Sequence, residues 1–486
     1  MFYVGYVLAF LYFNVILYSS ANFLPENVTL VHLFEWKWND VALECERFLQ
    51  HKGYNAIQIS PPNENLIIKG RAWWERYQPV SYTLSTRSGT EDEFRDMTKR
   101  CANVGVWIFA DAVINHMAGG NGIGTAGNVA DAMQLKFPGV PYGPNDFHSA
   151  CEINNYNNAE NVRDCRLNNL RDLNQSTSYV REKIIEYMNH LTHLGVAGFR
   201  IDAAKHIWPS DLKYIYSKLN NLNTEYGFPP NTKPYIYQEV IDRGGEAVHS
   251  NEYTSLGHVT EFKYCNSISN VFKGNDKLTY LVNWGTGWSF MESRYAVVFV
   301  DNHDTQRDSG ALTYKNAKQY KMANAFMLAH PYGTPKVMSS FFFDTRDQGP
   351  PHYNNDNLMS PKINPDDTCG NGYVCEHRWR QIYNMVVFRA TVRGTNINNW
   401  WSNGDQQIAF CRGNKGFIAF TNYGDLNQKL QTCLPTGQYC DVISGNLING
   451  KCTGKVINVD SQGFSNIFLA ANDFDGVIAT HIEVKL

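Results

Sequence analysis

The sequence predicts an α/β fold, a (β/α)₈ TIM barrel that carries a small inserted domain and is followed by an all-β domain. Eight short apolar runs recur along the chain, helical patterns lie between most of them, and several runs end in a carboxylate. Strand–helix alternation of this kind is typical of a parallel barrel. The strand C-termini of such a barrel converge on one face, which carries the active site.

Regularly spaced apolar segments are the expected barrel strands, at 30–36, 56–60, 106–113, 197–202, 235–240, 258–262, 297–301 and 336–340. Helical spacing of apolar residues predicts helices over 40–50, 180–194, 316–329 and 377–392. A further helix is expected to begin at Thr90, because Thr90 and Glu93 form a capping-box pattern.

Two stretches break this rhythm and predict separate domains. Residues 115–171 have little periodicity and much Gly, Asn and Pro, and a structureless loop of this length is improbable in a compact domain. We therefore expect an inserted domain after the third strand, with the barrel formed by 22–114 and 172–394. Residues 395–486 read as a Greek-key β-sandwich, with strands at 407–410, 417–421, 439–443 and 477–484.

Residues 1–21 are apolar and end in Ser19-Ser20-Ala21, which suits a secretory signal peptide cleaved before Asn22. The alternative is a membrane anchor, since no Lys or Arg precedes the apolar run. A secreted, extracellular and digestive protein is expected. Two short sequence patterns, at Asn27 and Asn174, could accept N-linked glycans.

The composition is that of a soluble globular protein, with 43% hydrophobic and 18% charged residues among 486. A net charge of −3 argues against a strongly electrostatic nucleic-acid or membrane surface. Aromatic residues reach 14%, which fits either a large aromatic core or flat rings that stack on sugars. We expect a monomer.

Eleven cysteines in a secreted chain suggest disulfides plus one unpaired thiol. No C-x-x-C pair is present, so a zinc site is not expected. Cys265 is left over when the others are paired by short separation or by neighbouring elements as Cys151–Cys165, Cys369–Cys375, Cys440–Cys452, Cys45–Cys101 and Cys411–Cys433.

Three acids come after short hydrophobic stretches, at or near the ends of predicted strands: Asp202, Glu239 and Asp304. A single Asp or Glu is more often a solvated surface acid. Their joint placement at barrel-strand ends predicts instead that all three meet in one cleft. Paired carboxylates in a sugar-sized cleft are the usual apparatus of glycoside hydrolysis. Arg200, two residues before Asp202, projects to the same side of its strand and is expected to keep Asp202 ionised.

Four motifs in order carry a resemblance to a known family: Asp111-Ala-Val-Ile-Asn-His116, Gly198–His206, Glu239-Val-Ile-Asp242 and Phe299–Asp304. Flanking segments at 33–38, 73–79 and 375–380 match as well. With them the sequence resembles the animal-type α-amylases of glycoside hydrolase family 13 over nearly its whole length after the leader. The short turn at 306–310 and the stretch 344–351 are more similar to insect members than to vertebrate ones.

The resemblance implies roles at the matched positions. Asp202 would be the nucleophile of a retaining mechanism, Glu239 the general acid and base, and Asp304 the stabiliser of an oxocarbenium-like transition state. At the scission point, sugar contacts would come from His116 and His303, with Arg200 beside them. Further contacts would come from an aromatic platform on the donor side and from polar and apolar residues on the acceptor side. The platform is the segment with Trp73, Trp74, Tyr77 and Gln78, and the acceptor side has Lys205 and Ile241.

Two ions are also implied by the resemblance. Asn115, Arg163, Asp172 and His206 match calcium ligands, with Arg163 and His206 using backbone carbonyls, and calcium prefers such oxygen donors. Arg200, Asn302 and Lys336 match a chloride site, in which the family usually has Arg at the third position. Because Lys lacks the bidentate fork of Arg, chloride binding stays open and weaker binding is expected.

The expected activity is endo-hydrolysis of internal α-1,4-glucosidic bonds in starch, glycogen and malto-oligosaccharides. One alternative keeps the fold but acts as an exo-α-glucosidase or transglycosylase. Another is a non-catalytic carbohydrate-binding or interaction homologue. Such homologues normally lose catalytic acids, whereas Asp202, Glu239 and Asp304 are all present.

Overall fold

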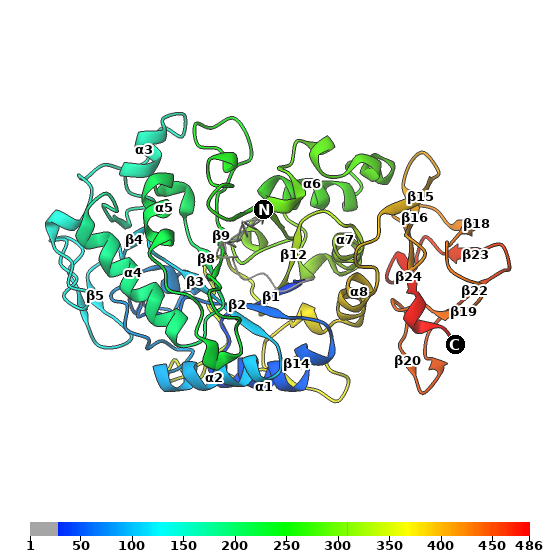
Figure 1. The fold of residues 1–486 in the computed structure, drawn as a ribbon, viewed down its shortest axis with the longest axis horizontal. Helices are drawn as coiled ribbons and strands as arrows, with labels where there is room; N and C mark the ends of the chain where they lie inside the picture. Colours follow the sequence, from blue (N-terminus) through cyan, green and yellow to red (C-terminus); the bar gives the residue numbers. More distant parts are fainter. Residues whose placement is uncertain (1–27, 309) are drawn as a thin grey trace, which may run out of the picture.

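The computed structural model describes residues 28–308 and 310–486, so the expected leader and the Asn27 pattern lie outside the described residues. Its centre is a closed barrel of eight parallel strands (Figure 1), which confirms the predicted fold class. In spatial order the strands are β1 (Leu30–Leu33), β12 (Thr334–Ser339), β11 (Ala296–Val298), β10 (His258–Thr260), β9 (Tyr235–Gln238), β8 (Gly198–Ile201), β3 (Trp107–Ala112) and β2 (Ala56–Ile59).

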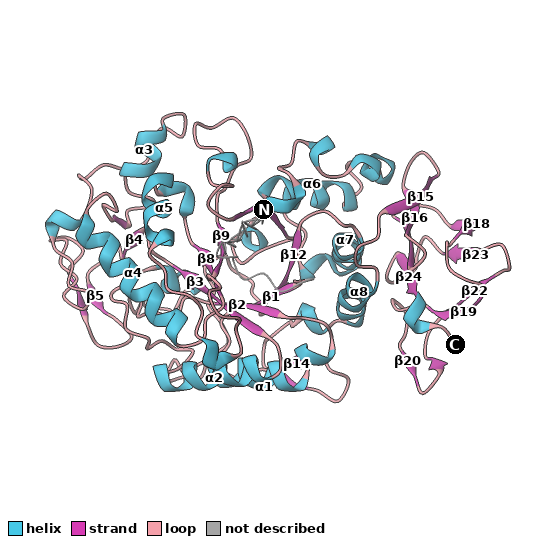
Figure 2. Cartoon of the chain, in the orientation of Figure 1, coloured by secondary structure: helices cyan, strands magenta, loops and turns pink. Residues whose placement is uncertain are grey.

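Helices surround the barrel (Figure 2). They are α1 (Trp38–Arg47), α2 (Glu91–Asn103), α4 (Ser178–His193), α5 (Pro209–Ser217), α6 (Phe262–Phe272), α7 (Ala317–Ala329) and α8 (Arg380–Thr391). The predicted capping box is present at α2, where the Thr90 side chain accepts a hydrogen bond from the Glu93 backbone N–H. Strands β1, β2, β8 and β9 are buried at every residue, because helices cover the outside and side chains fill the inside.

Between β3 and β8 the chain leaves the barrel and forms short elements: β4 (His116–Met117), β5 (Gly122–Ile123), β6 (Val129–Ala130), α3 (Ala159–Asp164) and β7 (Arg171–Asp172). In Figure 1 this excursion lies at the end of the molecule opposite the C-terminal strands. Strand β4 pairs antiparallel with β7, so that His116 faces Asp172. This pairing brings the excursion back to the barrel beside the end of β3.

The C-terminal residues form an all-β unit at the other end of the molecule (Figure 1). Strands β15 (Ile397–Ser402), β16 (Gln407–Arg412), β17 (Gly416–Thr421) and β24 (Val477–His481) make one antiparallel sheet. Side chains alternate along β16: Ile408 and Phe410 join the core shared with the barrel, whereas Ala409 and Cys411 join a second core. Further antiparallel pairs are β18 (Leu426–Gln431) with β23 (Phe464–Leu469), and β19 (Gly437–Cys440) with β22 (Val456–Val459).

Five disulfides are present, at the same pairs that the sequence suggests: Cys45–Cys101, Cys151–Cys165, Cys369–Cys375, Cys411–Cys433 and Cys440–Cys452. Cys265 is a buried free thiol on α6. Among the described residues, no helix combines the length and apolar character needed to cross a membrane.

Candidate active site

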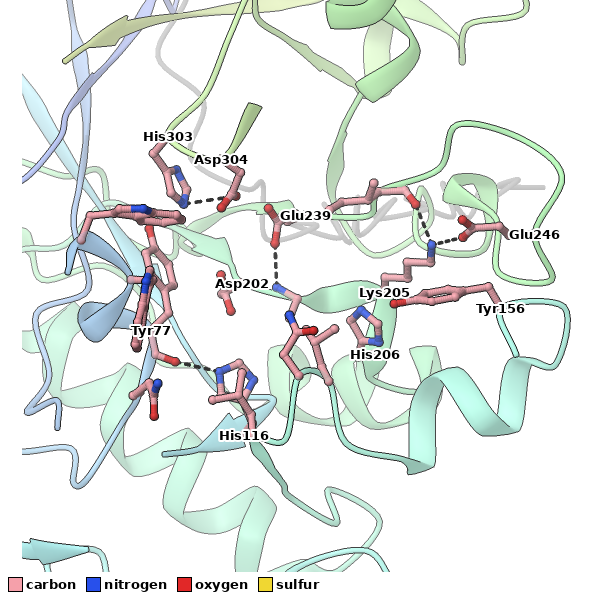
Figure 3. A pocket seen from close by; sticks show the side chains of 18 residues that line it. Tyr77, His116, Tyr156, Asp202, Lys205, His206, Glu239, Glu246, His303 and Asp304 are labelled. Atoms are coloured by element: carbon pink, nitrogen blue, oxygen red, sulfur yellow. Dashed lines mark hydrogen bonds and ion pairs between the residues drawn. The ribbon is translucent and has the colours of Figure 1, made fainter. Parts of the chain in front are cut away.

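A cleft of about 590 Å³ opens where the barrel strands end (Figure 3). It brings together the three predicted acids and every predicted sugar-contacting residue except Arg200, which is buried behind its wall. The lining residues are Trp73, Trp74, Tyr77, Gln78, His116, Tyr156, Leu167, Asn168, Leu170, Asp202, Ala203, Lys205, His206, Glu239, Ile241, Glu246, His303 and Asp304.

The barrel strands position the acids. Asp202 directly follows β8 and Glu239 directly follows β9, and the backbone N–H of Glu239 donates to the Ile201 carbonyl at 2.9 Å. These two carboxyls therefore project from neighbouring strand ends. Asp304 comes from a loop, because β11 ends at Val298 and does not reach the predicted end at 301. The Asp304 side chain is also more accessible, at 39% exposed.

Arg200 joins the buried acids. Its Nη1 lies 2.6 Å from Asp111 Oδ1 and 2.7 Å from Asp202 Oδ1, and its Nη2 lies 2.5 Å from Glu239 Oε1. One guanidinium thus holds three carboxyls, which would otherwise repel one another in a desolvated site. Asp111 was not among the predicted site residues. The signal was available, because Asp111 opens the first of the four motifs and lies in the predicted strand 106–113. In the structure it is paired in register with Arg200 across β3 and β8.

The protonation of this cluster differs from the sequence expectation. Burial raises the pKa of Asp202 well above its usual value, and Arg200 opposes that shift. Burial likewise raises the pKa of Asp111, again against Arg200. The acids therefore form one group of interacting carboxyls that shares its protons. Within it Arg200 favours but does not alone secure the ionised form of Asp202.

Ala203, next to Asp202, has a left-handed backbone with φ 48°. Non-glycine residues rarely adopt this conformation, and such strain is concentrated at functional sites. The turn aims the Ala203 backbone N–H at Glu239, where it donates to Oε2 at 3.0 Å. The strained turn therefore links the two carboxyls that follow β8 and β9.

Aromatic rings and histidines form the wall beside Asp304. His303 stacks on Tyr77 with ring centroids 5.1 Å apart, and its Nε2 lies 3.3 Å from Asp304 Oδ2. Trp73 meets the His303 ring edge-on at 5.6 Å. Burial lowers the pKa of His303 well below its usual value, so the ring is neutral near pH 7. This wall offers flat apolar faces together with neutral hydrogen-bonding groups.

His116 completes the same side of the cleft. Burial lowers the pKa of His116 to about 4, so the ring is neutral, and its Nε2 lies 3.0 Å from the Tyr77 carbonyl. A carbonyl only accepts, so Nε2 carries the proton and Nδ1 is free to accept from Asn115 Nδ2 at 3.2 Å. This contact turns the amide of Asn115 so that Nδ2 faces His116.

The opposite side of the cleft is polar. Lys205 donates to the Ile241 carbonyl at 2.8 Å, forms an ion pair with Glu246 and lies 5.0 Å from the centre of the Tyr156 ring. Sequence reasoning missed Glu246 and Tyr156. Both lie outside the strand-end motifs, in segments with no periodic pattern, so the sequence held no signal that could have found them.

The expected calcium ligands lie where β4, β7 and α3 meet. Asn115 Nδ2 is 3.4 Å from Asp172 Oδ1, and the His206 ring contacts the carbonyl of Val162, the residue before Arg163, at 2.8 Å. Asn115 Oδ1 is buried and has no hydrogen-bond partner among the described residues. Within residues 28–308 and 310–486, there is no cluster of three or more His, Cys, Asp or Glu side chains that could hold a metal. The expected set does not need one, since it uses one carboxylate, one amide and two carbonyls.

The expected chloride residues lie behind the acids. Lys336 donates to Gln58 Oε1 at 2.9 Å, and burial together with nearby Arg200 lowers the pKa of Lys336 to about 8. Asn302 Oδ1 accepts from the backbone N–H groups of Asp304 and Thr305 at 3.0 and 2.8 Å. That engagement leaves the NH₂ group of Asn302 as the part suited to an anion. Two buried cations repel each other here, and a bound anion would relieve that repulsion.

Comparison with known proteins gives a consistent result. Residues 47–240 match the family described as "Alpha amylase, catalytic domain", and residues 400–483 match "Alpha amylase, C-terminal all-beta domain". An alpha-amylase of Tenebrio molitor is 60% identical over 96% of this chain and 100% of its own length. An alpha-amylase-related protein of Drosophila bocqueti is 56% identical over 94% of each chain.

Solved structures agree as well. The crystal structure of alpha-amylase I from Eisenia fetida matches with a TM-score of 0.90 at 43% identity, covering 95% of this chain and 99% of that one. A mutant of the same enzyme in complex with maltohexaose matches with a TM-score of 0.87 at 44% identity and the same coverage.

Proposed function

Because the chain belongs to the α-amylase family, we propose that it hydrolyses internal α-1,4-glucosidic bonds of starch and glycogen and acts on malto-oligosaccharides. The observation that carries the proposal is the shared guanidinium of Arg200, which holds Asp202 and Glu239 side by side at the floor of the cleft. Two carboxyls on one guanidinium favour the separation of roughly 5–5.5 Å that is typical of retaining glycosidases.

In the proposed mechanism Asp202 attacks the anomeric carbon and forms a covalent glycosyl-enzyme. Glu239 first protonates the leaving oxygen and then takes a proton from the incoming water. Asp304 stabilises the positive charge that develops on the sugar ring. His116 and His303 bind the sugar at the scission point, and Arg200 acts there through the acids that it holds. The Trp73–Tyr77 segment and Gln78 bind the donor side, and Lys205 and Ile241 the acceptor side.

Dye release from cross-linked starch tests this function. An endo-acting enzyme releases large soluble fragments early, whereas an exo-acting glucosidase or transglycosylase releases little dye. A non-catalytic homologue releases none. Proton NMR of the first product tests the mechanism, because retention gives the α-anomer before mutarotation, and an initial β-anomer would exclude a glycosyl-enzyme.

We further propose one structural calcium ion at Asn115, Asp172 and the carbonyls of Arg163 and His206. The buried, unpartnered Oδ1 of Asn115 supports this assignment, since calcium prefers oxygen ligands. When bound, the ion would join the excursion between β3 and β8 to the barrel and so hold the wall of the cleft that contains His116. It would take no part in bond cleavage.

Chelation of calcium is expected to lower the melting temperature and the activity together. A ligand that binds only the folded state stabilises it by about 4 kcal/mol at 1,000 times its dissociation constant. The measurement is calorimetry and starch hydrolysis before and after EDTA treatment, with metal content determined on the same samples. Loss of the metal with unchanged melting temperature and activity would exclude this role.

We also propose a weak chloride site at Arg200, Asn302 and Lys336. Its affinity should depend on pH, because Lys336 has a pKa of about 8 and attracts an anion only when charged. Above pH 8 the apparent affinity for chloride is expected to fall about tenfold per pH unit, because the fraction of protein with a charged Lys336 falls by the same factor. Chloride titrations of activity at pH 7 and pH 9 measure this.

The matched variant for the chloride site is Lys336→Arg, which stays charged at both pH values and offers more fixed donors. It should bind chloride more tightly and with little pH dependence. Activity that is indifferent to chloride in the parent protein at pH 7 would refute the site. In that case the Lys336 ammonium would serve only as a fixed partner of Gln58.

Three organisational features complete the proposal. We propose that residues 115–171 act as an inserted domain of the barrel formed by 22–114 and 172–394, and that residues 395–486 form the C-terminal domain. We propose that the protein is secreted after removal of residues 1–21 and acts as a monomer outside the cell. Mass spectrometry of the N-terminus of the secreted protein tests the cleavage site.

A further inference from the structure

Arg307 is a buried cation behind the aromatic platform. It ends a 3₁₀ turn, Thr305–Arg307, that follows Asp304, and it is only 9% exposed. The guanidinium carbon lies 4.1 Å from the centre of the Phe343 ring and 5.2 Å from those of Trp73 and Phe341. Arg307 is absent from the cleft lining, so it does not face the space that a sugar would occupy.

The hydrogen bonds of Arg307 and Trp73 converge on one carbonyl. Arg307 Nη1 donates to the Arg346 carbonyl at 2.7 Å and to the Gln348 carbonyl at 3.1 Å. Trp73 Nε1 donates to the same Arg346 carbonyl at 2.9 Å. The indole is therefore held at its edge by a backbone carbonyl that Arg307 fixes, and on its face by the guanidinium of Arg307.

The charge of Arg307 has no carboxylate partner. No described Asp or Glu forms an ion pair with it, and its Nε and Nη2 are buried with no hydrogen-bond partner in the described part of the chain. Burial lowers the pKa of Arg307 to about 10, which leaves it charged at neutral pH. By contrast, buried Arg76 and Arg378 are paired with Glu35 and Glu44 at 3.0 and 2.6 Å.

A buried cation without a contacting acid is costly. Asp304, Glu35 and Asp347 act on Arg307 only through space, so the aromatic faces and the two carbonyls are its direct compensation. Moving any of these partners away would expose an uncompensated charge in the interior. The Arg307 cation therefore restrains the positions of these rings and carbonyls, and they restrain the position of the cation. Trp73 is the one among them that lines the cleft.

Arg307 is also tied to the acid side of the cleft. Its backbone N–H donates to the Asp304 carbonyl at 3.0 Å, within the same turn. On the other side of Trp73, the rings of Tyr77 and His303 follow at 6.1 and 5.6 Å. Arg307 thus connects the loop of Asp304, the ring of Trp73 and the 346–348 backbone at a single point.

We propose that Arg307 is a positioning residue for the donor side of the cleft, which fixes the ring plane of Trp73 for stacking on a sugar. The inference rests on the proposed function, since it concerns how that site binds a glucan. Without Arg307 the Arg346 carbonyl loses one anchor and the indole loses the cation on its face. The ring then samples orientations that do not stack on the sugar, which weakens binding before it affects bond cleavage.

The test is Arg307→Met, which keeps much of the side-chain volume and removes the charge and the donors. Maltohexaose binding is measured by calorimetry in the Asp202→Asn background, where turnover is blocked. We expect about tenfold weaker binding, and in the active protein a rise in KM of similar size with kcat changed by less than about threefold. Arg307→Lys, which keeps the charge but not the paired donors, should lie between the two.

Arg412→Met is the matched control. Arg412 is also buried, at 4% exposed, donates to two backbone carbonyls, leaves Nε unpartnered and has a pKa lowered to about 10 by burial. It lies on β16 in the C-terminal unit, far from the platform. Its loss should change melting temperature by an amount comparable to Arg307→Met and leave maltohexaose binding unchanged.

A double-mutant cycle with Trp73→Leu shows whether Arg307 acts through the indole. In the Trp73→Leu background, Arg307→Met should cause no further loss of binding. Additive losses, or a folded Arg307→Met variant that binds like its parent, would overturn the inference while leaving the proposed function intact. Failure of the parent to bind or cleave maltohexaose would overturn the proposed function, and the inference with it.

Discussion

Replacing Asp202 by Asn is expected to reduce starch hydrolysis by about 10⁴-fold or more while the protein stays folded. The amide is isosteric with the carboxylate but cannot form the glycosyl-enzyme, and loss of a nucleophile has effects of this order or larger. Glu239→Gln removes general acid and base catalysis, which is worth about 10²–10⁴-fold. The measurements are initial rates on soluble starch and thermal unfolding of both variants.

Asp211→Asn provides the control for this chemistry. Asp211 is a largely buried acid on α5 that pairs with Arg181 at 3.2 Å, and it lies outside the cleft. The Asp211→Asn variant carries the same carboxylate-to-amide change and should retain most of the activity. Starch hydrolysis at the parental rate by folded Asp202→Asn or Glu239→Gln would refute the proposed roles.

The positions of β8 and β9 could be predicted from the sequence, because each short apolar run is followed at once by a carboxylate. The predicted strands run too far, by one residue at β8, which ends at Ile201, and by two at β9, which ends at Gln238. At β11 the same reasoning also extends the strand too far. Phe299 and Val300 are buried, yet they lie beyond the last paired residue, Val298. Apolar periodicity reports burial, whereas strand ends are set by hydrogen-bond pairing.

The interior of the site could not be derived from local patterns. Gln58 donates to Asp111 across 53 residues of sequence and accepts from Lys336 across 278. The Arg346 carbonyl accepts hydrogen bonds from Trp73, which follows β2, and from Arg307, which follows β11 late in the barrel sequence. Such contacts depend on the closed barrel, which joins β1 to β12, and no short motif encodes them.

Arg200→Met is expected to have the second large effect, on stability as well as activity. Arg200 is 2% exposed and is the shared partner of Asp111, Asp202 and Glu239. Removing one partner of a buried ion pair typically costs about 3–5 kcal/mol, because the remaining charge is left uncompensated in the interior. Loss of activity should accompany this, since the carboxyls no longer share a fixed partner.

The loss of stability in Arg200→Met should depend on pH. Burial already raises the pKa of Asp111 and Asp202 against the pull of Arg200, and without Arg200 nothing of that size opposes the shift. An acid whose pKa is higher in the folded than in the unfolded state holds its proton in the folded protein. The stability of the variant is therefore lost as the pH rises above the unfolded value near 4. The parent also loses stability while its own raised acids stay protonated, so the deficit of the variant opens only as the parent acids ionise beside Arg200. This deficit should be larger at pH 7 than at pH 4.

Urea unfolding of parent and variant at both pH values measures this difference. Chloride-free buffer keeps loss of the proposed anion site out of the comparison. Arg200→Lys keeps one positive charge but lacks the planar guanidinium that contacts three carboxyls at once. It should therefore restore part of the stability at pH 7 and little of the activity. A folded Arg200→Met variant as stable as the parent at pH 7 would mean that the acids are compensated elsewhere. Lys336, which lies near enough to Arg200 for the two charges to oppose each other, would then be the group to replace.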